Sequence, residues 1–363
     1  MKLTRRAVLA AAPLLAAPLL AAPPIISARG ASRRAVSFTL PWVAEGSNLV
    51  AYVAKDRGYW DEAGLDVTIT RGYGSVAAAQ AIGAGKFDFG LAAASAGIQQ
   101  AAKGLPVIAI ACSGYDSTMG VGVLGDSPIR TPKDLAGKTL GCTLASGEYP
   151  FLPAFFRNAG IDPDSVKIQG TDPQVRTRVL IERQVDAISG FAISIAPVVG
   201  AQKIPVRFML FSQAGLKQYN NMLMTTRAMV DKDPALCRAV ALGLARANRD
   251  VMLDPEGAIK SFFKLVPEVA LTATGRENTR IGLGIYQVNM IDDAAKNHVI
   301  GYSDPADYAA MIEMVMKYAV SPGDKTPAAS DVFTNELIGD IALDATQWSK
   351  VEASAAPYRA YIS

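Results

Sequence analysis

The sequence predicts an α/β protein built from two similar lobes, and three observations lead to this prediction. From Val36 onward, short β-branched or apolar runs alternate with helical patterns, which is typical of α/β folds with largely parallel strands. Part of this alternation occurs twice along the chain. The 363 residues, of which 50% are hydrophobic and 19% charged, suffice for two domains. We therefore expect each lobe to contain a mostly parallel sheet flanked by helices.

The expected elements alternate over the first two thirds of the chain. The predicted strands are 36–41, 66–70, 87–91, 106–111, 138–142, 165–169, 185–189 and 205–210. The predicted helices lie near 47–57, 75–84, 95–103, 148–159, 173–183 and 192–200. The tail from Met222 is expected to be mostly helical. One of its helices should begin at Asp233 and Pro234, because aspartate caps helices and proline fits the first helical position.

A weak internal repeat supports the division into two lobes. Gly64 and Gly160 each follow a predicted helix, and each is followed two residues later by an aspartate, Asp66 or Asp162, and then by a strand. Further along, Asp88 and Asp186 each lie at the start of another strand. The interval from glycine to aspartate differs by only two residues between the copies. Two lobes of similar construction follow from this repeat.

The lobe boundaries are expected where helix signals are weak, near 113–130 and 211–222. We assign residues 32–120 and 222–363 to lobe 1 and residues 121–221 to lobe 2. The helical tail must pack on a lobe that already exists, and the chain order suggests the first. The chain then crosses between the lobes twice. Two crossings act as a hinge, and a hinge between two α/β lobes makes a cleft that closes around a ligand.

Residues 1–31 are predicted to be a signal peptide of the twin-arginine type. Arg5 and Arg6 precede an apolar stretch that Pro13 and Pro18 interrupt, which makes it shorter than the ~20 residues of a membrane-spanning helix. Because the first cysteine is Cys112, no lipid anchor is expected, and we expect a periplasmic protein. Outside this segment 32 Lys and Arg face 33 Asp and Glu, so neither nucleic acid nor an anionic membrane is an expected partner.

The composition leaves little material for catalysis or metal binding. His298 is the single histidine, and Cys112, Cys142 and Cys237 lack the spacing of a redox motif or zinc site. We therefore expect no metal, no cofactor and three buried free thiols. Residues 120–125 satisfy G-x-G-x-x-G, but Pro128 follows where a phosphate-binding helix would begin, which argues against a dinucleotide site.

Several segments resemble substrate-binding proteins of ABC importers, in the family that binds thiamine-pyrimidine precursors, nitrate, taurine and alkanesulfonates. The matching stretches are Phe38-Thr39-Leu40-Pro41-Trp42, Ala51 to Val67, Gly85 to Gly90, Asp134 to Lys138, Val185 to Gly190 and Ser330 to Leu337. This resemblance implies a two-lobe periplasmic binding protein fold (type II), a membrane permease as partner and no enzymatic activity. Related eukaryotic enzymes make a pyrimidine with a histidine and clustered cysteines, whereas here the single histidine lies in the tail and the cysteines are not clustered. A sensory binding subunit remains an alternative.

The ligand site is expected at strand ends and helix starts, because ligands of open α/β sheets bind there. In lobe 1, Trp42 follows the first strand and suits stacking on a planar ring, Gly74 and Ser75 open a helix, and Ser95 lies at the next strand–helix junction. Core packing for the tryptophan and plain capping for the others remain the alternatives.

In lobe 2, the candidates lie in two segments. Ser146, Gly147, Glu148 and Tyr149 precede a helix at a position that contacts ligand in the family, and Ser189 and Phe191 end a later strand. The aromatic rings and the glutamate favour a planar, pyrimidine-like or other heteroaromatic ligand, since a carboxylate accepts hydrogen bonds from ligand amines. A sulfonate, nitrate or aromatic carboxylate is the alternative ligand, and the protein is expected to act as a monomer.

Overall fold

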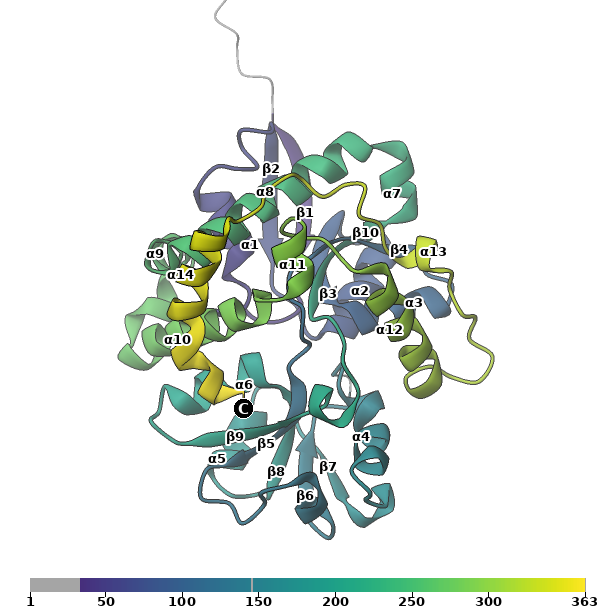
Figure 1. The fold of residues 1–363 in the computed structure, drawn as a ribbon, viewed down its shortest axis with the longest axis vertical. Helices are drawn as coiled ribbons and strands as arrows, with labels where there is room; N and C mark the ends of the chain where they lie inside the picture. The colour runs from purple at the N-terminus through teal and green to yellow at the C-terminus, as the bar shows by residue number, and fades with distance from the viewer. Residues whose placement is uncertain (1–32, 145, 363) are drawn as a thin grey trace, which may run out of the picture. The chain divides into compact units, whose positions relative to one another are not determined.

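The computed structural model describes residues 33–144 and 146–362. These residues form two five-stranded sheets that are flanked by helices (Figure 1). The predicted signal peptide lies outside the described residues. The two-lobe α/β fold predicted from the alternation of strands and helices is therefore confirmed, with mixed rather than wholly parallel sheets.

The first sheet belongs to lobe 1 and has the strand order β2-β1-β3-β10-β4. β10 runs antiparallel to both of its neighbours, whereas β1 is parallel to β2 and β3. Three helices follow the early strands in turn. The elements are β1 (Arg34–Thr39), α1 (Leu49–Asp56), β2 (Leu65–Thr70), α2 (Ser75–Gly83), β3 (Phe89–Ala93), α3 (Ala94–Ala102), β4 (Val107–Cys112) and β10 (Asn221–Thr226).

The second sheet belongs to lobe 2 and repeats this plan with the order β7-β6-β8-β5-β9. Here β5 is antiparallel to β8 and β9, and β6 is parallel to β7 and β8. The elements are β5 (Met119–Leu124), η1 (Pro132–Leu135), β6 (Thr139–Cys142), η2 (Tyr149–Phe151), α4 (Leu152–Asn158), η3 (Pro163–Ser165), β7 (Lys167–Gly170), α5 (Arg176–Ile181), β8 (Ala187–Phe191), α6 (Ala192–Gly200), β9 (Val206–Leu210) and η4 (Ser212–Ala214).

β5 and β10 are the two strands that the sequence patterns missed. Both directly follow a crossing between the lobes. β5 carries the G-x-G-x-x-G pattern, and glycine is a weak strand former. A Cβ at Gly120 would lie 2.7 Å from the Met209 carbonyl oxygen, and one at Gly122 would lie 2.8 Å from the Phe208 ring. These glycines therefore allow close packing against β9.

Two segments, 113–118 and 211–220, run between the two sheets. They are hydrogen-bonded to each other: Ser113 N donates to Asn221 O at 2.8 Å, and Ser117 N donates to Gln218 O at 2.7 Å. Gly114 has a φ of +152°, and a Cβ there would lie 2.3 Å from Asn289 Oδ1. The crossings thus form one narrow, paired connection. The division of the chain at residues 120 and 222 stays a prediction.

The tail is helical, as expected from its apolar spacing. Asp233 accepts a hydrogen bond from Leu236 N and so caps α8. α8 and α9 pack on α1 of lobe 1, as predicted, but α10 also packs on α6 of lobe 2. The tail therefore contacts both lobes. Its helices are α7 (Arg227–Lys232), α8 (Pro234–Leu253), α9 (Pro255–Leu265), η5 (Pro267–Leu271), α10 (Ala273–Met290), α11 (Asp293–Asn297), α12 (Pro305–Tyr318), α13 (Ala329–Val332), α14 (Ala345–Ala355) and η6 (Ala356–Tyr361).

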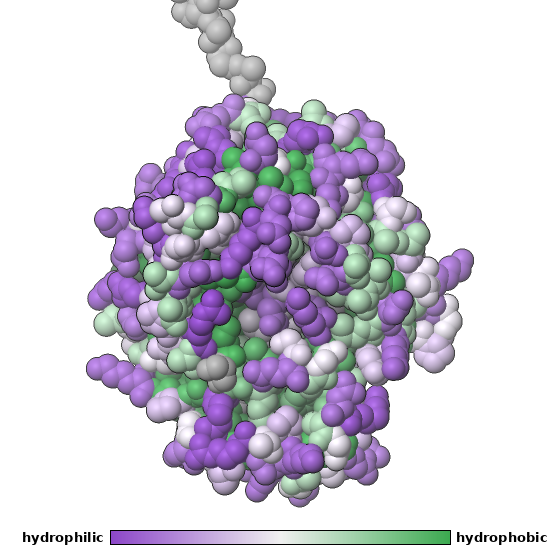
Figure 2. Space-filling model, in the orientation of Figure 1, coloured by the Kyte–Doolittle hydropathy of each residue, from purple (hydrophilic) through white to green (hydrophobic). Residues whose placement is uncertain are grey.

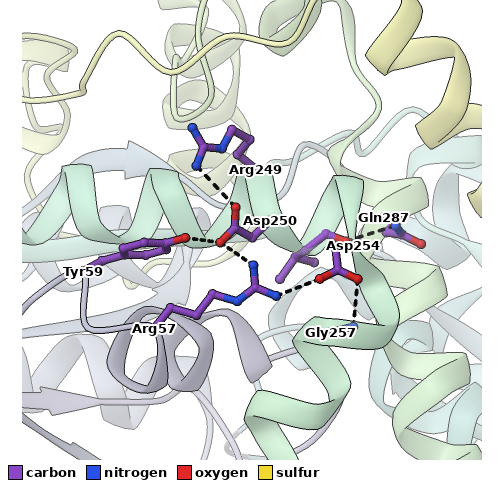
Figure 3. A network of polar contacts seen from close by, with 8 residues as sticks. Arg57, Tyr59, Arg249, Asp250, Asp254, Gly257 and Gln287 are labelled. Atoms are coloured by element: carbon purple, nitrogen blue, oxygen red, sulfur yellow. Dashed lines mark hydrogen bonds and ion pairs between the residues drawn. The ribbon is translucent and has the colours of Figure 1, made fainter.

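A network of polar contacts ties the end of α1 to the tail (Figure 3). Arg57 Nη1 lies 2.6 Å from Asp250 Oδ2, and Arg57 Nη2 lies 3.1 Å from Asp254 Oδ2. The Tyr59 hydroxyl also donates to Asp250. Desolvation raises the pKa of Tyr59, and the neighbouring Asp250 adds to this rise. The charges in this network have partners, so we assign it a structural role.

All three cysteines are free and buried, which confirms the sequence prediction. Burial raises the pKa of the Cys112 thiol to about 12.

On the face drawn in Figure 2, hydrophilic residues cover most of the surface and hydrophobic residues appear in small groups between them. None of the helices in the described part of the chain is long and apolar enough to cross a membrane.

Candidate functional site

A pocket lies between the lobes, with an empty volume of about 450 Å³ that includes space open to solvent. Residues of lobe 1, lobe 2 and the second crossing line it. We call this space the inner pocket. Its lining residues are Pro41, Trp42, Glu45, Ser47, Asn48, Gly74, Ser75, Ser146, Arg176, Phe191, Ile193, Ser194, Asn220 and Asn221.

The turn before α2 positions the lobe 1 wall of the inner pocket. Gly72 N donates to Trp42 O, and Gly74 N donates to Pro41 O, each at 2.9 Å. A Cβ at position 72 would lie 2.0 Å from Leu40 O, so only glycine allows this approach. The turn therefore holds the segment that carries Trp42 against the end of β1.

Glu45 links the two lobes across the inner pocket. Its Oε1 accepts hydrogen bonds from Ser47 Oγ of lobe 1 and Ser194 Oγ of lobe 2, each at 2.6 Å. Desolvation raises the pKa of Glu45 to about 7, although the two hydroxyls and the charge of Arg176 oppose this rise. The bond to Ser194 joins the two lobes in this structure.

Arg176 is a buried positive charge in the wall of lobe 2. The residue is only 5% exposed, and its Nε has no hydrogen-bond partner. The guanidinium carbon lies 5.8 Å from the centre of the Trp42 ring, a cation–π distance. Burial lowers the pKa of Arg176, while the charges of Glu148 and Glu45 act in the opposite direction. An acceptor group on a ligand would satisfy this side chain.

Glu148 lies beside the inner pocket rather than in its lining. It is completely buried and accepts hydrogen bonds from Ser146 Oγ and, at 3.1 Å, from Ser189 Oγ. The sequence predicts that this carboxylate contacts the ligand. In the structure it interacts with two hydroxyls of its own lobe, and its charge acts on the nearby Arg176.

Five of the residues predicted to bind ligand line the inner pocket together: Trp42, Gly74, Ser75, Ser146 and Phe191. The other five lie outside the lining: Ser95, Gly147, Glu148, Tyr149 and Ser189. Ser95 is not the N-cap of α3, since Ala93 holds that position, and its buried Oγ has no partner. A Cβ at Gly147 would lie 3.4 Å from the Phe191 ring. Ligand contact by all ten residues stays a prediction.

Several lining residues were missed, among them Glu45, Asn48, Arg176 and Ser194. Ser75 was predicted because it lies at the start of a helix, and the same pattern fits Asn48 and Arg176. Asn48 is the N-cap of α1, and Arg176 is the first residue of α5, so both lie where a helix begins at a strand end. Glu45 lies in an irregular segment, and no sequence pattern indicated its contact with Ser194.

A second, more open space adjoins the inner pocket. We call it the outer groove; α5, α6 and α10 contribute to its walls. It shares Trp42, Glu45, Arg176 and Ser194 with the inner pocket. These four residues therefore separate the inner pocket from the outer groove. The described residues contain no cluster of His, Cys, Asp and Glu able to hold a metal ion.

Comparison with known proteins identifies the fold and the family. A Brucella abortus protein named as a binding protein is 26% identical over 142 residues, which are 39% of this chain and 43% of that relative. A 4-amino-5-hydroxymethyl-2-methylpyrimidine phosphate synthase of Saccharomyces cerevisiae, THI11, is 23% identical over 246 residues, which are 64% of this chain and 72% of that protein.

Among solved structures, the alkanesulfonate-binding protein SsuA from Xanthomonas axonopodis pv. citri aligns with a TM-score of 0.63 at 15% identity, covering 84% of this chain and all of that one. This likeness confirms the two-lobe periplasmic binding protein fold. The family model described as NMT1/THI5 like matches residues 47–258, more than half of the chain. The chain therefore belongs to the NMT1/THI5-like family.

Proposed function

We propose that this protein is the periplasmic solute-binding component of an ABC importer, which captures a small planar solute between its lobes and delivers it to a membrane permease. The observation that carries this proposal is the inner pocket, to which both lobes contribute lining residues. A solute that contacts both walls stabilises the closed form, and the closed form is what a permease would recognise. SsuA, which shares the fold, is named for binding alkanesulfonates.

The inner pocket favours binding over catalysis. Its described lining contains neither the histidine nor any of the three cysteines, which are buried elsewhere. His298 instead stacks on Tyr302, with 3.8 Å between ring centres. Although the yeast relative is named as a synthase, we propose that this chain releases its solute unchanged. Recovery of a converted product after incubation with the solute would contradict this part of the proposal.

Trp42→Ala tests the site. Removing the indole should weaken solute binding by about 3- to 10-fold, the value of one aromatic contact, with little change in thermal stability because Trp42 is only half-buried. The solute is first identified by mass spectrometry of the small molecule that co-purifies with the protein. Tyr73→Ala is the matched control, since Tyr73 is 68% exposed and does not line the inner pocket. Equal affinities in both variants would remove Trp42 from the site.

A further inference from the structure

The inner pocket contains a buried guanidinium, that of Arg176, on which the charges of Glu148 and Glu45 act without forming an ion pair with it. Arg176 is 95% buried, its Nε has no partner, and none of the ion pairs among the described residues includes it. Burying an unpaired guanidinium costs free energy, and an anionic group that pairs with it would offset part of this cost. The guanidinium presents a planar fork of donors, which matches the two oxygens of a carboxylate.

Three helices begin at the wall of the inner pocket and add to this positive character. Asn48 caps α1, Gly74 caps α2, and Ile193 lies in the first turn of α6; all three residues line the pocket. Helix N-termini carry a partial positive charge and favour anions. None of these three helices has an acidic residue in its first turn or a side-chain hydrogen bond at its cap. Their charge is therefore not compensated by their own residues.

The two nearby glutamates leave room for an anion. Glu148 is occupied by the hydroxyls of Ser146 and Ser189 and does not line the pocket. Glu45 has a pKa near 7, so it is largely neutral in mildly acidic solution. Both of its hydrogen bonds from described residues reach Oε1. In the ionised form its second oxygen suits a donor group on the solute.

We propose that the solute is a planar aromatic acid whose carboxylate pairs with Arg176 and whose N–H or O–H group donates to Glu45. This inference rests on the proposed function, because it specifies the solute of the same pocket. The rings of Trp42 and Phe191 supply the apolar wall for the flat part of such a molecule. We therefore rank an aromatic carboxylate ahead of a neutral pyrimidine and ahead of a sulfonate as the solute.

The test compares each acid with a neutral and a sulfonate counterpart of the same shape. Calorimetry with the full-chain protein measures one- and two-ring aromatic acids, their primary amides and their sulfonates, represented by benzoate, benzamide and benzenesulfonate. The acids should bind at least about 10-fold more tightly than the amides, because a hydrogen bond to a charged group exceeds a neutral one. At least one isomer of hydroxybenzoate or aminobenzoate should bind more tightly than benzoate.

Two variants assign these preferences to residues. Arg176→Gln should weaken benzoate binding by about 10- to 100-fold and leave benzamide binding nearly unchanged, and Arg176→Lys should restore part of the loss. Glu45→Gln should remove the advantage of the hydroxy or amino acid over benzoate. If Arg176→Gln does not fold, the ratio of acid to amide in the unaltered protein and in Arg176→Lys decides the matter.

The outcomes separate this inference from the proposed function. Amides or sulfonates that bind as tightly as the acids would overturn the inference and leave a solute-binding protein. Equal loss for benzoate and benzamide in Arg176→Gln would also overturn it, since the arginine would then be structural. If no member of the three series binds and no small molecule co-purifies, both the inference and the proposed function fail.

Discussion

At the scale of single residues, the protonation of Glu45 links closure of the cleft to pH. In the closed form its carboxyl group is desolvated and bonded to Ser47 and Ser194 from opposite lobes. Desolvation raises its pKa more than the two hydroxyls and, to a smaller extent, the charge of Arg176 lower it. The protonated carboxyl group is therefore favoured in the closed form, whereas an open cleft exposes the same group to water.

We predict that the closed, solute-free form loses population as pH rises. The pKa of Glu45 is about 7 when the cleft is closed and near its ordinary value of 4.5 when solvated, so the closed form binds the proton more tightly. Its advantage is complete below the lower value and is lost as pH rises through 7. Small-angle scattering should show a larger radius of gyration at about pH 8 than at about pH 5.5.

The control is Glu45→Gln, whose side chain cannot ionise. This variant should have the same radius of gyration at both pH values. A pH response that persists in this variant would assign the effect to another group.

At the scale of elements, the contact between α1 and α8 depends on the network around Asp250 (Figure 3). Arg57 follows α1 and forms ion pairs with Asp250 in α8 and with Asp254, the N-cap of α9. Because the Asp250 side chain is only 11% exposed, its charge requires these donors.

We predict that Arg57→Ala lowers the free energy of unfolding by about 1–3 kcal/mol, because it leaves a mostly buried carboxylate short of a partner. Urea denaturation checks this value. Arg178→Ala is the matched control, since the Arg178–Glu182 pair has the same 2.6 Å separation but an arginine that is 71% exposed. The control should change stability little. Equal effects of the two substitutions would show that Asp250 is satisfied without Arg57.

At the scale of the whole molecule, the end of the described chain connects the lobes a third time. α14 packs on α8 and α10, and η6 packs on α10 and also on α6 and β9 of lobe 2 (Figure 1). Tyr361 lies so close to α6 that a Cβ at Gly200 would be 2.6 Å from its ring. Closure therefore involves this terminal segment as well as the two crossings.

We predict that Tyr361→Ala shifts the molecule toward the open form and weakens solute binding by about 3- to 10-fold, because a partly buried aromatic contact with lobe 2 is lost. Titration calorimetry with the co-purified solute gives the affinity, and small-angle scattering gives the opening. Arg359→Ala, at an exposed position of the same 3-10 helix, should change neither quantity. An unchanged affinity in Tyr361→Ala would show that closure depends on the two crossings and not on this terminal contact.

The periodic parts of this protein were predictable from its sequence, because burial leaves a local pattern of apolar residues in each strand and helix. The order of β1 to β4 and the cap of α8 by Asp233 follow from such patterns. The positions of Trp42, Ser75 and Phe191 beside a cleft follow from the rule that ligands bind at strand ends.

Only the tertiary structure decided how β5 and β10 enter their sheets and which charges meet in the inner pocket. β5 is rich in glycine and its neighbours come from other parts of the chain, so its local pattern is weak. Glu45 and Ser194 are 149 positions apart, and Arg176 comes from a third segment. Such contacts depend on the angle at which two lobes meet, and no local pattern of residues records that angle.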